Sequence, residues 1–283
     1  MNTQIKLIDV GFGYVSKQLI LQHLNYTFQA GHVYGVIGLS GSGKSTFCKL
    51  IANLVLPTNG QINYFDELII TNHKKCKKLY YQLNSQVGYV MQFCEKQLLG
   101  NSVLEEVLMG YENFHGKYET NKALAINWLK QLNFDESLIT KNVFAISQGQ
   151  QRKVALASIL ILNQPVLIFD EPTVGLDYET KIALTTIIKK LKQEKKIVII
   201  ISHDFDWLYS LCSSCLWLDQ KQIKFSDQCP HFFFNKELPM SFNHVPFMVQ
   251  LLNEYEHQTK TIILNKTKYL TLNDFLKDHF LPN

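Results

Sequence analysis

The stretch that decides the fold reads, in order, Gly38, Leu39, Ser40, Gly41, Ser42, Gly43, Lys44, Ser45 and Thr46. It fits the pattern G-x-x-x-x-G-K-[ST], which is typical of a loop that binds phosphate. A strand pattern, Val33–Ile37, precedes it, and a helical pattern, Phe47–Leu56, follows it. This is the context that the motif requires. The alternative is a Gly/Ser-rich turn with a chance lysine, and the flanking strand and helix argue against it.

The residue types of this loop explain how it can hold a nucleotide. Its glycines let consecutive backbone N–H groups turn inward, and the following helix adds the positive end of its dipole. Lys44 can reach the β- and γ-phosphates, and the Ser45 hydroxyl can ligate Mg²⁺. We therefore expect a nucleotide bound together with Mg²⁺.

Two other strand patterns end in polar side chains. Gln92 follows the strand pattern Val87–Met91, and ligands of open α/β sheets bind at such carboxyl ends. Its amide can meet a water bound to Mg²⁺. The strand pattern beginning at Val166 ends in Asp170 and Glu171. Asp170 can hold Mg²⁺ through water, and Glu171 can accept a proton from an attacking water. A purely structural pair of acids here would be costly to bury.

His203 follows a third such strand pattern, Lys196–Ile201. Single histidines are usually surface or core residues. The position of His203 at a strand end that faces the same cleft favours a functional role. It could hydrogen-bond the γ-phosphate and keep Glu171 and the attacking water aligned.

A second possible anion site directly precedes a long helical pattern and consists of Ser147, Gln148 and Gly149. They combine a hydroxyl, a flexible backbone amide and the positive end of a helix. The alternative is a plain Ser N-cap, and these residues alone do not decide between the two. Tyr14, in the loop after the first strand pattern, can stack on an adenine ring or be a half-buried tyrosine; both interpretations stay open.

Composition limits the class of protein. The chain has 283 residues, 46% hydrophobic content and a net charge of +4, which suits one large domain with a small appendage. Arg152 is the only arginine. Because proteins that bind nucleic acid rely on arginine, we expect no nucleic-acid partner. The sequence shows no secretion signal and no run long enough to span a bilayer, and its six cysteines suit a reducing cytosol.

The order of patterns predicts an α/β fold with short antiparallel strands near the start, a helical region from about 101 to 163 and a closing hairpin before residue 235. Residues 236–283 follow as a small annex. In it we expect a helix from about Pro246 to Tyr255, a strand around Thr261–Leu264 and a helix from about Asn273 to Phe280. It contains no catalytic constellation.

In this order the motifs resemble those of the ATP-binding cassette (ABC) ATPases over residues 1–235. The resemblance implies a P-loop NTPase of ABC type: a mixed RecA-like core sheet, an antiparallel β-subdomain, an α-helical signature subdomain at about 93–163, and the C-terminal α/β annex. Tyr14 matches the adenine-stacking aromatic of that family. The other matching elements are Gly38–Thr46 (Walker A), Gln92 (Q-loop), Ile146, Ser147, Gln148, Gly149 and Gln150 (signature), Val166–Glu171 (Walker B and glutamate), Gly175, Leu176 and Asp177 (D-loop), and His203 (switch histidine).

Within that family the chain looks like the ATPase subunit of energy-coupling factor (ECF) transporters, which take up vitamins. The segment Met91–Leu99 resembles their Q-F-P-E-x-Q-L-F, with Cys94 in place of proline. The annex also resembles that group, where it helps to hold two ATPases together. ATPases of cobalt and nickel transporters are close relatives. The signature departs from Leu-Ser-Gly-Gly-Gln at Ile146 and at Gln148, which replaces the first glycine.

The resemblance implies that two ATPase subunits, copies or homologues, enclose two ATP molecules, with each signature capping the other's loop. The surface near Gln92–Leu99 would dock an integral membrane scaffold, and a separate membrane protein would bind the substrate. The chain would then lie on the cytoplasmic face of a bacterial cell membrane. Two alternatives remain: a soluble ABC ATPase outside transport, and a regulatory subunit with weak hydrolysis. Intact Glu171 and His203 argue against the regulatory subunit, and Gln148 favours it mildly.

Overall fold

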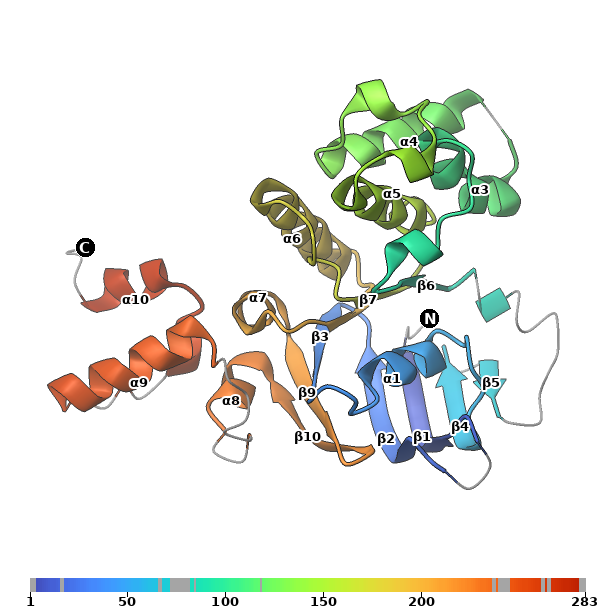
Figure 1. Cartoon of the computed structure of the whole chain (residues 1–283). Coiled ribbons are helices and arrows are strands. Elements are labelled where there is room, and N and C mark those ends of the chain that lie inside the picture. The colour runs from blue at the N-terminus through green and yellow to red at the C-terminus, as the bar shows by residue number, and fades with distance from the viewer. Residues whose placement is uncertain are drawn as a thin grey trace.

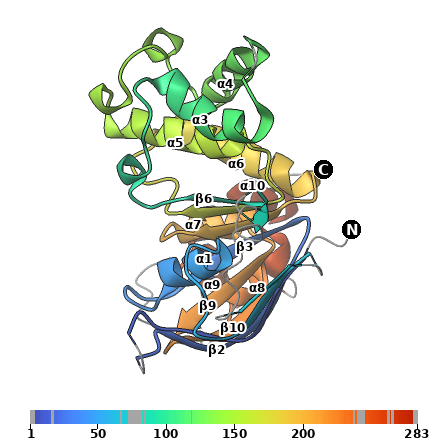
Figure 2. The same cartoon turned by 90° about the vertical axis from the view of Figure 1, so that its right-hand side faces the viewer.

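The computed structural model describes residues 4–15, 18–65, 68–71, 82–83, 85–117, 119–235, 238, 245–260, 263 and 266–279. Within this part of the chain, no helix is both long and apolar enough to cross a bilayer. Figures 1 and 2 show two sheets, a group of helices standing on one side of them, and the annex at the end opposite β4 and β5.

A six-stranded mixed sheet forms the centre of the molecule. Its strands lie in the order β10 (Gln222–Gln228), β9 (Ser214–Asp219), β3 (His32–Ile37), β8 (Ile197–Ile201), β7 (Val166–Asp170) and β6 (Val87–Val90). The strands from β9 to β6 pair in parallel, and only β10 is antiparallel to its neighbour. Four of these five parallel strands, β3, β8, β7 and β6, bring their carboxyl ends together at one edge of the sheet.

A second, antiparallel sheet has the order β2 (Leu21–Gln29), β1 (Gln4–Phe12), β4 (Asn59–Tyr64) and β5 (Leu68–Ile70). Helix α1 (Lys44–Ile51) packs in the same apolar cluster as both sheets, through Phe47 and Leu50 among others. The antiparallel β-subdomain expected from the resemblance is thus confirmed.

Successive residues of the buried strands in the central sheet contact two different apolar cores, one on each face. Leu167 and Phe169 of β7 join the core on the helical side, whereas Val166 and Ile168 join the core shared with the antiparallel sheet. The period of two along the strand produces this division. Because both faces are covered, these strands read as continuous apolar runs.

The helices on the other face fall into three groups. The upper group in Figure 1 contains η1 (Cys94–Lys96), α3 (Val103–His115), α4 (Glu119–Gln131), η2 (Glu136–Leu138), η3 (Val143–Ala145) and α5 (Gln148–Leu160). Beside the sheet lie α6 (Tyr178–Gln193), α7 (Phe205–Leu211) and α8 (Cys229–Phe233). The annex contains α9 (Phe247–Thr259), η4 (Lys266–Lys268) and α10 (Leu272–His279).

Some boundaries differ from the sequence predictions, and local geometry explains why. α1 starts at Lys44 because Gly43 caps it with φ 97°, and it ends at Ile51, before Asn53 turns to φ 55°. α5 starts at Gln148, two residues earlier than predicted, because Ser147 closes a capping box over it. α8 was not predicted.

Both helices predicted in the annex are confirmed with shifted ends. The strand predicted there lies outside the described residues apart from Ile263. Met248, Leu252, Tyr269 and Phe275 of the annex belong to the same apolar cluster as the central sheet's helical side. The annex therefore packs on the body of the molecule and is not separated from it by solvent.

Candidate functional site

The carboxyl ends of β3, β8, β7 and β6 open into one cavity of about 360 Å³, which we call the strand-end cleft. Its lining residues are Ile20, Ser40, Gly41, Gly43, Lys44, Ser45, Thr46, Gln92, Asp170, Glu171, Ile201 and His203. Residues predicted from four separate strand ends thus lie around a single space. Gly38, Leu39 and Ser42 belong to the same loop but do not line the cleft.

The loop between β3 and α1 is shaped to receive an anion. Gly41 and Gly43 have φ values of 78° and 97°, a region that favours glycine. No side chain caps the amino end of α1, so its first N–H groups are available to an anion. Ser42 Oγ is buried with no hydrogen-bond partner in the described part of the chain, and this donor suits a phosphate oxygen.

Lys44 lies folded back on this loop. Its Nζ donates to the carbonyl oxygens of Gly38 and Leu39 at 2.8 and 2.9 Å. Burial lowers the pKa of Lys44 from its ordinary value, and the carboxylates of Glu171 and Asp170 oppose this shift. Lys44 lines the same cavity as the two acids, and its ammonium can exchange the two carbonyls for phosphate oxygens.

Asp170, at the end of β7, is 3% exposed. Its Oδ2 accepts a hydrogen bond from the Tyr89 hydroxyl of β6 at 3.0 Å. Among the described residues no group of three or more His, Cys, Asp or Glu side chains could hold a metal ion. The oxygens of Ser45, Gln92 and Asp170 form a hard donor set that suits Mg²⁺ completed by phosphate and water.

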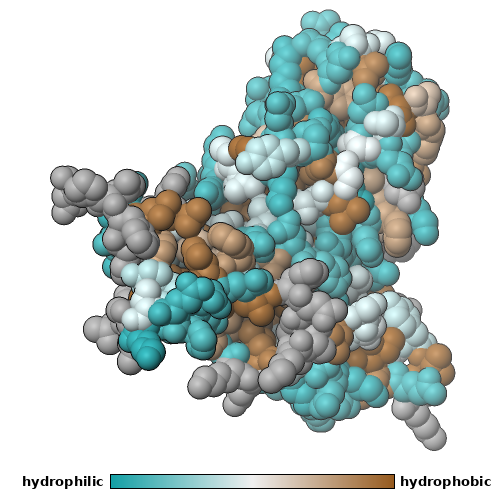
Figure 3. Space-filling model, turned by 60° about the vertical axis from the view of Figure 1, so that its left-hand side comes forward, coloured by the Kyte–Doolittle hydropathy of each residue, from teal (hydrophilic) through white to brown (hydrophobic). Residues whose placement is uncertain are grey.

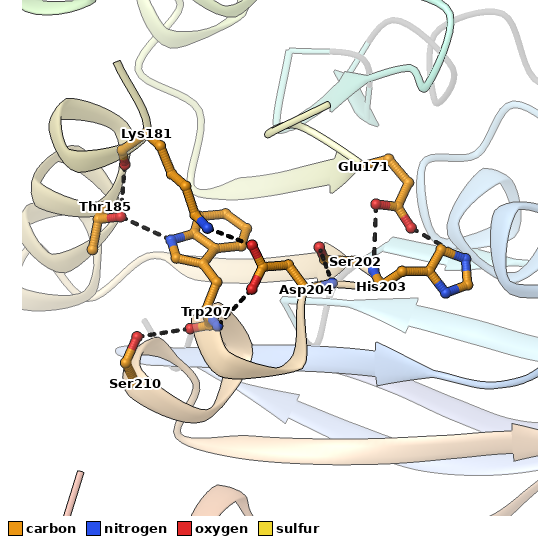
Figure 4. Close-up of polar contacts among 8 residues, drawn as sticks. All are labelled: Glu171, Lys181, Thr185, Ser202, His203, Asp204, Trp207 and Ser210. Atoms are coloured by element: carbon orange, nitrogen blue, oxygen red, sulfur yellow. Dashed lines mark hydrogen bonds and ion pairs between the residues drawn. The ribbon is translucent and has the colours of Figure 1, made fainter. Parts of the chain in front are cut away.

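Glu171 and His203, which follow β7 and β8, point toward each other (Figure 4). The His203 backbone N–H donates to Glu171 Oε2, and His203 Nε2 lies 3.4 Å from Oε1. Burial raises the pKa of Glu171 to about 7, with the Asp170 charge adding to the shift while the His203 N–H and the Lys44 charge oppose it. Burial and the Lys44 charge lower the pKa of His203. Near neutral pH the pair can therefore hold one exchangeable proton.

A hydrogen-bond network behind His203 fixes its place after β8 (Figure 4). Asp204 caps α7 by accepting from Trp207 N at 3.0 Å, and it pairs with Lys181 of α6. The Trp207 indole N–H donates to Thr185 Oγ1 at 2.8 Å. The segment that carries His203 is thus attached to both α6 and α7.

Sequence reasoning missed Arg152 as a site residue. It lies in α5 and is 7% exposed. Its Nη1 donates to the Glu171 carbonyl and its Nη2 to the Gln92 carbonyl, each at 2.5 Å. The available signal was the chain's one arginine, two residues before the apolar run Val154–Ala157. Tyr89, the partner of Asp170, was likewise missed and left no signal beyond its strand position.

The predicted signature residues lie outside the cleft, at the amino end of α5. Ser147 Oγ accepts from Gln150 N at 3.3 Å, and Gln150 Oε1 accepts from Ser147 N at 2.9 Å. Ser147 is therefore an N-cap, as the plainer interpretation held, and the helix dipole still points outward there. Ser147 and Gln148 are exposed.

Asp177 caps α6 next to this helix end. It accepts from Thr180 N at 2.7 Å and pairs with Lys153 of α5 at 2.9 Å, contacts that hold its pKa well below the ordinary value. A Cβ on Gly149 would lie 2.8 Å from the Gly175 carbonyl oxygen. The predicted signature, at Gly149, and the predicted D-loop, at Gly175, are thus in direct contact.

Tyr14 borders a second cavity, of about 430 Å³, with Ile20 in its lining. Ile20 also lines the strand-end cleft, so the two cavities adjoin. The Tyr14 ring is 58% exposed and meets Phe12 edge-on at 4.8 Å. The exposed Tyr14 ring lines a cavity next to the strand-end cleft and has space to stack on a base.

Comparisons with known proteins identify the family. A family model described as ABC transporter matches residues 21–174. The energy-coupling factor transporter ATP-binding protein EcfA2 of Leuconostoc mesenteroides is 36% identical over 228 residues, which cover 81% of this chain and 79% of that protein. EcfA2 of Staphylococcus aureus (strain bovine RF122) is 32% identical over 259 residues, which cover 89% of this chain and 90% of that protein.

Solved structures show the same fold. The dimeric ATP-binding cassette MJ0796, in a post-hydrolysis state bound to ADP and Pi, superposes with a TM-score of 0.72 at 27% identity, covering 80% of this chain and 98% of that one. The cbiO1 protein of Clostridium perfringens, part of the ABC transporter complex cbiONQ, gives a TM-score of 0.70 at 24% identity. The match covers 92% of this chain and 100% of cbiO1. With the strand-end cleft and the curated relatives, these matches show that the chain belongs to the ABC transporter ATP-binding family, in the group of energy-coupling factor transporter ATP-binding proteins.

Proposed function

We propose that this chain, the ATPase subunit of an energy-coupling factor transporter, hydrolyses ATP with Mg²⁺ in the strand-end cleft. The energy would drive uptake of a vitamin, another micronutrient or a metal ion through membrane partners. The convergence of Lys44, Asp170, Glu171 and His203 on one cavity of about 360 Å³ carries the proposal.

Each group has a role that follows from its position. Lys44 and the loop N–H groups hold the β- and γ-phosphates, and Tyr14 stacks on the adenine. Ser45 and Gln92 would ligate Mg²⁺, with Asp170 acting partly through water. The ion would supply charge stabilisation on the phosphates. Tyr89 keeps Asp170 oriented through its 3.0 Å hydrogen bond.

Glu171 is the general base in this proposal. A pKa of about 7 suits a base that works near neutral pH, because the carboxylate is present and still accepts a proton effectively. It orients and deprotonates the attacking water, and neutral His203 hydrogen-bonds the γ-phosphate. Lys44 stabilises the charge that develops on that phosphate.

The signature residues act on a second ATPase subunit, a copy or a homologue. Ser147, Gln148, Gly149 and Gln150 stand outside the cleft of their own chain at an outward helix end. A phosphate presented by a partner would meet the Ser147 hydroxyl and the first free N–H groups of α5. The D-loop residue Asp177 lies beside them. Gln148, where the family has glycine, is placed to tune turnover in the opposite site.

The surface from Gln92 to Leu99 is the proposed dock for the integral membrane scaffold. Phe93 is 54% exposed and Leu99 is 74% exposed, and Lys96 Nζ lies 4.9 Å from the centre of the Phe93 ring. Large apolar side chains exposed beside Gln92 could let a docked helix sense the cleft. A separate membrane protein would bind the substrate, and the chain would lie peripherally on the cytoplasmic face of the membrane.

The annex is the proposed second contact between ATPase subunits. In the division that we propose, residues 1–235 form the ATPase domain, with its helical subdomain at about 93–163, and residues 236–283 form a dimerisation-type annex. Phe247, Leu270 and Leu272 are 54%, 40% and 42% exposed. Apolar side chains gather on the side of the molecule that Figure 3 shows, which suits a protein partner.

A trapping experiment tests the proposal. With ATP and Mg²⁺, Glu171→Gln should retain nucleotide and slow phosphate release by the membrane complex about 100- to 10,000-fold, the usual contribution of a general base. In size-exclusion chromatography the variant should associate through its ATP with a partner ATPase subunit. Unimpaired phosphate release by Glu171→Gln would remove the proposed role of Glu171. If the wild-type chain, purified from cell membranes, brings no integral membrane protein with it, a non-transport ATPase would be favoured.

A further inference from the structure

Arg152 joins three elements of the site through one buried side chain. It lies in α5, shortly after the signature residues, and is 7% exposed. Its guanidinium donates from Nη1 to the carbonyl of Glu171, after β7, and from Nη2 to the carbonyl of Gln92, after β6. Both acceptors belong to the main chain, so this cation holds backbone rather than a carboxylate.

The backbone that Arg152 holds at Glu171 is unusual. Glu171 has φ 51°, in the left-handed region that a glutamate rarely adopts. Such a residue persists only when its surroundings fix it. Here the Glu171 N–H donates to Ile201 O at 2.9 Å on one side, and the carbonyl accepts from Arg152 on the other. Without Arg152 the peptide after Glu171 could rotate and carry the carboxylate away from His203.

The helix that carries Arg152 is attached to the neighbouring loop as well. Lys153, the next residue, pairs with Asp177 at 2.9 Å and donates to Asn133 O at 2.9 Å. One turn earlier, Gly149 lies against the Gly175 carbonyl. A small displacement of the amino end of α5 must therefore be transmitted to the loops at the cleft.

We propose that Arg152 is the positioning residue that couples the signature helix to hydrolysis in the chain's own cleft. When a partner's nucleotide binds at Ser147–Gln150, α5 settles in one position and Arg152 fixes the backbone of Glu171 and Gln92 together. The inference rests on the proposed function, because it requires a nucleotide shared between two subunits. Arg152 itself touches no reacting atom.

The chemistry of the side chain explains why arginine is needed. Two nitrogens of one rigid plane reach two carbonyls at once, whereas a lysine ammonium is a point donor on a flexible stem. Lysine at this position would have to reach both carbonyls from a single nitrogen and without the fixed fork of the guanidinium. Glutamine would remove the charge and most of the reach.

The test uses the assembled membrane complex and compares Arg152→Lys and Arg152→Gln with a matched control. Lys196 provides the control: it is also 7% exposed and donates to the backbone carbonyls of Asn163 and Gln164 at 2.8 and 3.0 Å, but it precedes β8 at the edge away from the cleft. Lys196→Met therefore removes a buried cation of the same kind. For each variant, kcat, KM for ATP, ATP affinity and thermal stability are measured.

We expect Arg152→Gln to lower kcat about 10- to 100-fold, in line with the effect of misplacing a catalytic group by about 1 Å. KM and ATP affinity should stay within about 3-fold, since Arg152 is outside the phosphate loop. Arg152→Lys should fall between wild type and Arg152→Gln. Lys196→Met should lose comparable thermal stability and keep its kcat.

Three results would overturn the inference. The first is an unchanged kcat in Arg152→Gln, and the second is a loss of ATP affinity in Arg152→Gln as large as its loss of kcat. The third is an equal loss of kcat in Lys196→Met and Arg152→Gln when the two variants have the same melting temperature. The Glu171→Gln background separates this failure from that of the proposed function. If Glu171→Gln with Arg152 intact does not associate with a partner through ATP, the shared site is wrong and the coupling falls with it. If it does associate and Arg152→Gln retains full kcat, only the coupling is wrong.

Discussion

Replacing Glu171 with glutamine should stabilise the nucleotide-free protein above neutral pH and change little in acid. Glu171 is 6% exposed, and burial raises its pKa from 4.5 to about 7. As pH rises from about 4.5 to about 7, the unfolded chain loses this proton while the folded chain keeps it. Stability contributed by the neutral carboxyl is therefore complete below the unfolded pKa and is lost as pH rises through the folded pKa.

The size of the effect follows from the two pKa values. At about 1.4 kcal/mol for each pH unit between them, ionised Glu171 costs the folded state about 3 kcal/mol at pH values above about 7. Glutamine has the same shape and does not ionise, so it avoids this cost. With about 2 °C per kcal/mol for a chain of this size, the melting temperature of Glu171→Gln should exceed that of wild type by about 6 °C at about pH 8. At about pH 5 most of this difference should disappear.

Calorimetric melting without nucleotide or Mg²⁺, at about pH 5 and about pH 8, measures the difference. Glu254→Gln is the matched control, because Glu254 is an exposed glutamate on α9 and its replacement should change stability by less than about 0.5 kcal/mol at either pH. If Glu171→Gln melts with wild type at about pH 8, or gains equally at both pH values, Glu171 is not held neutral by burial and its assignment as a tuned base loses its physical ground.

Four further predictions concern the same cleft. Hydrolysis should decline below neutral pH with an apparent pKa near 7, since Glu171 must be ionised to accept a proton; a pH profile of kcat that stays flat in mild acid would contradict this. Tyr89→Phe removes the hydrogen bond to Asp170, so stability should fall by about 1.5–3 kcal/mol, the usual contribution of a bond to a charged group, and half-maximal hydrolysis should need more Mg²⁺. Lys44→Ala should weaken ATP binding at least about 10-fold in a fluorescent-nucleotide titration, because charge-assisted hydrogen bonds to phosphate are lost. Tyr14→Ala should weaken ATP binding about 10-fold through lost stacking, which contributes about 1–3 kcal/mol, and Tyr14→Phe should not; equal affinity in both variants would leave Tyr14 as a plain surface tyrosine.

Much of the cleft was predictable because the topology of an α/β sheet determines it. The strand patterns predicted to end at Ile37, Met91 and Ile201, and the one ending in Asp170 and Glu171, correspond to β3, β6, β8 and β7, and parallel pairing brings their carboxyl ends to one edge. The functional residues at or just after these ends consequently lie near one another, although they are far apart in the sequence. The antiparallel strands and the helices of the annex follow from patterns of period 2 and 3.6 in the same way.

Contacts made by long side chains across the fold were not predictable. Arg152 is separated from Gln92 by 60 residues, and nothing in the local sequence shows which backbone a buried guanidinium will reach. Gln97 is a second case: its side chain accepts from Met91 N and donates to Tyr89 O, each at 3.2 Å, where the sequence shows only a polar residue in a loop. The starts of α1 and α5 were missed by three and two residues, because helix caps depend on local geometry such as φ 97° at Gly43 and the capping box at Ser147.

The features that break the local rules gather where the chemistry is proposed to occur. Glu171 is a carboxyl buried at a cost and held at φ 51°, Ser42 Oγ is buried without a hydrogen-bond partner in the described part of the chain, and the first N–H groups of α1 lack a capping side chain. Each is unfavourable for the isolated fold. A phosphate in the loop would bond Ser42 and the N–H groups, and a water on the γ-phosphate would bond the Glu171 carboxylate. Since ATP would improve all three at once, nucleotide should stabilise the fold far more than the number of its contacts suggests, and this difference in free energy is what a transporter could use to change shape.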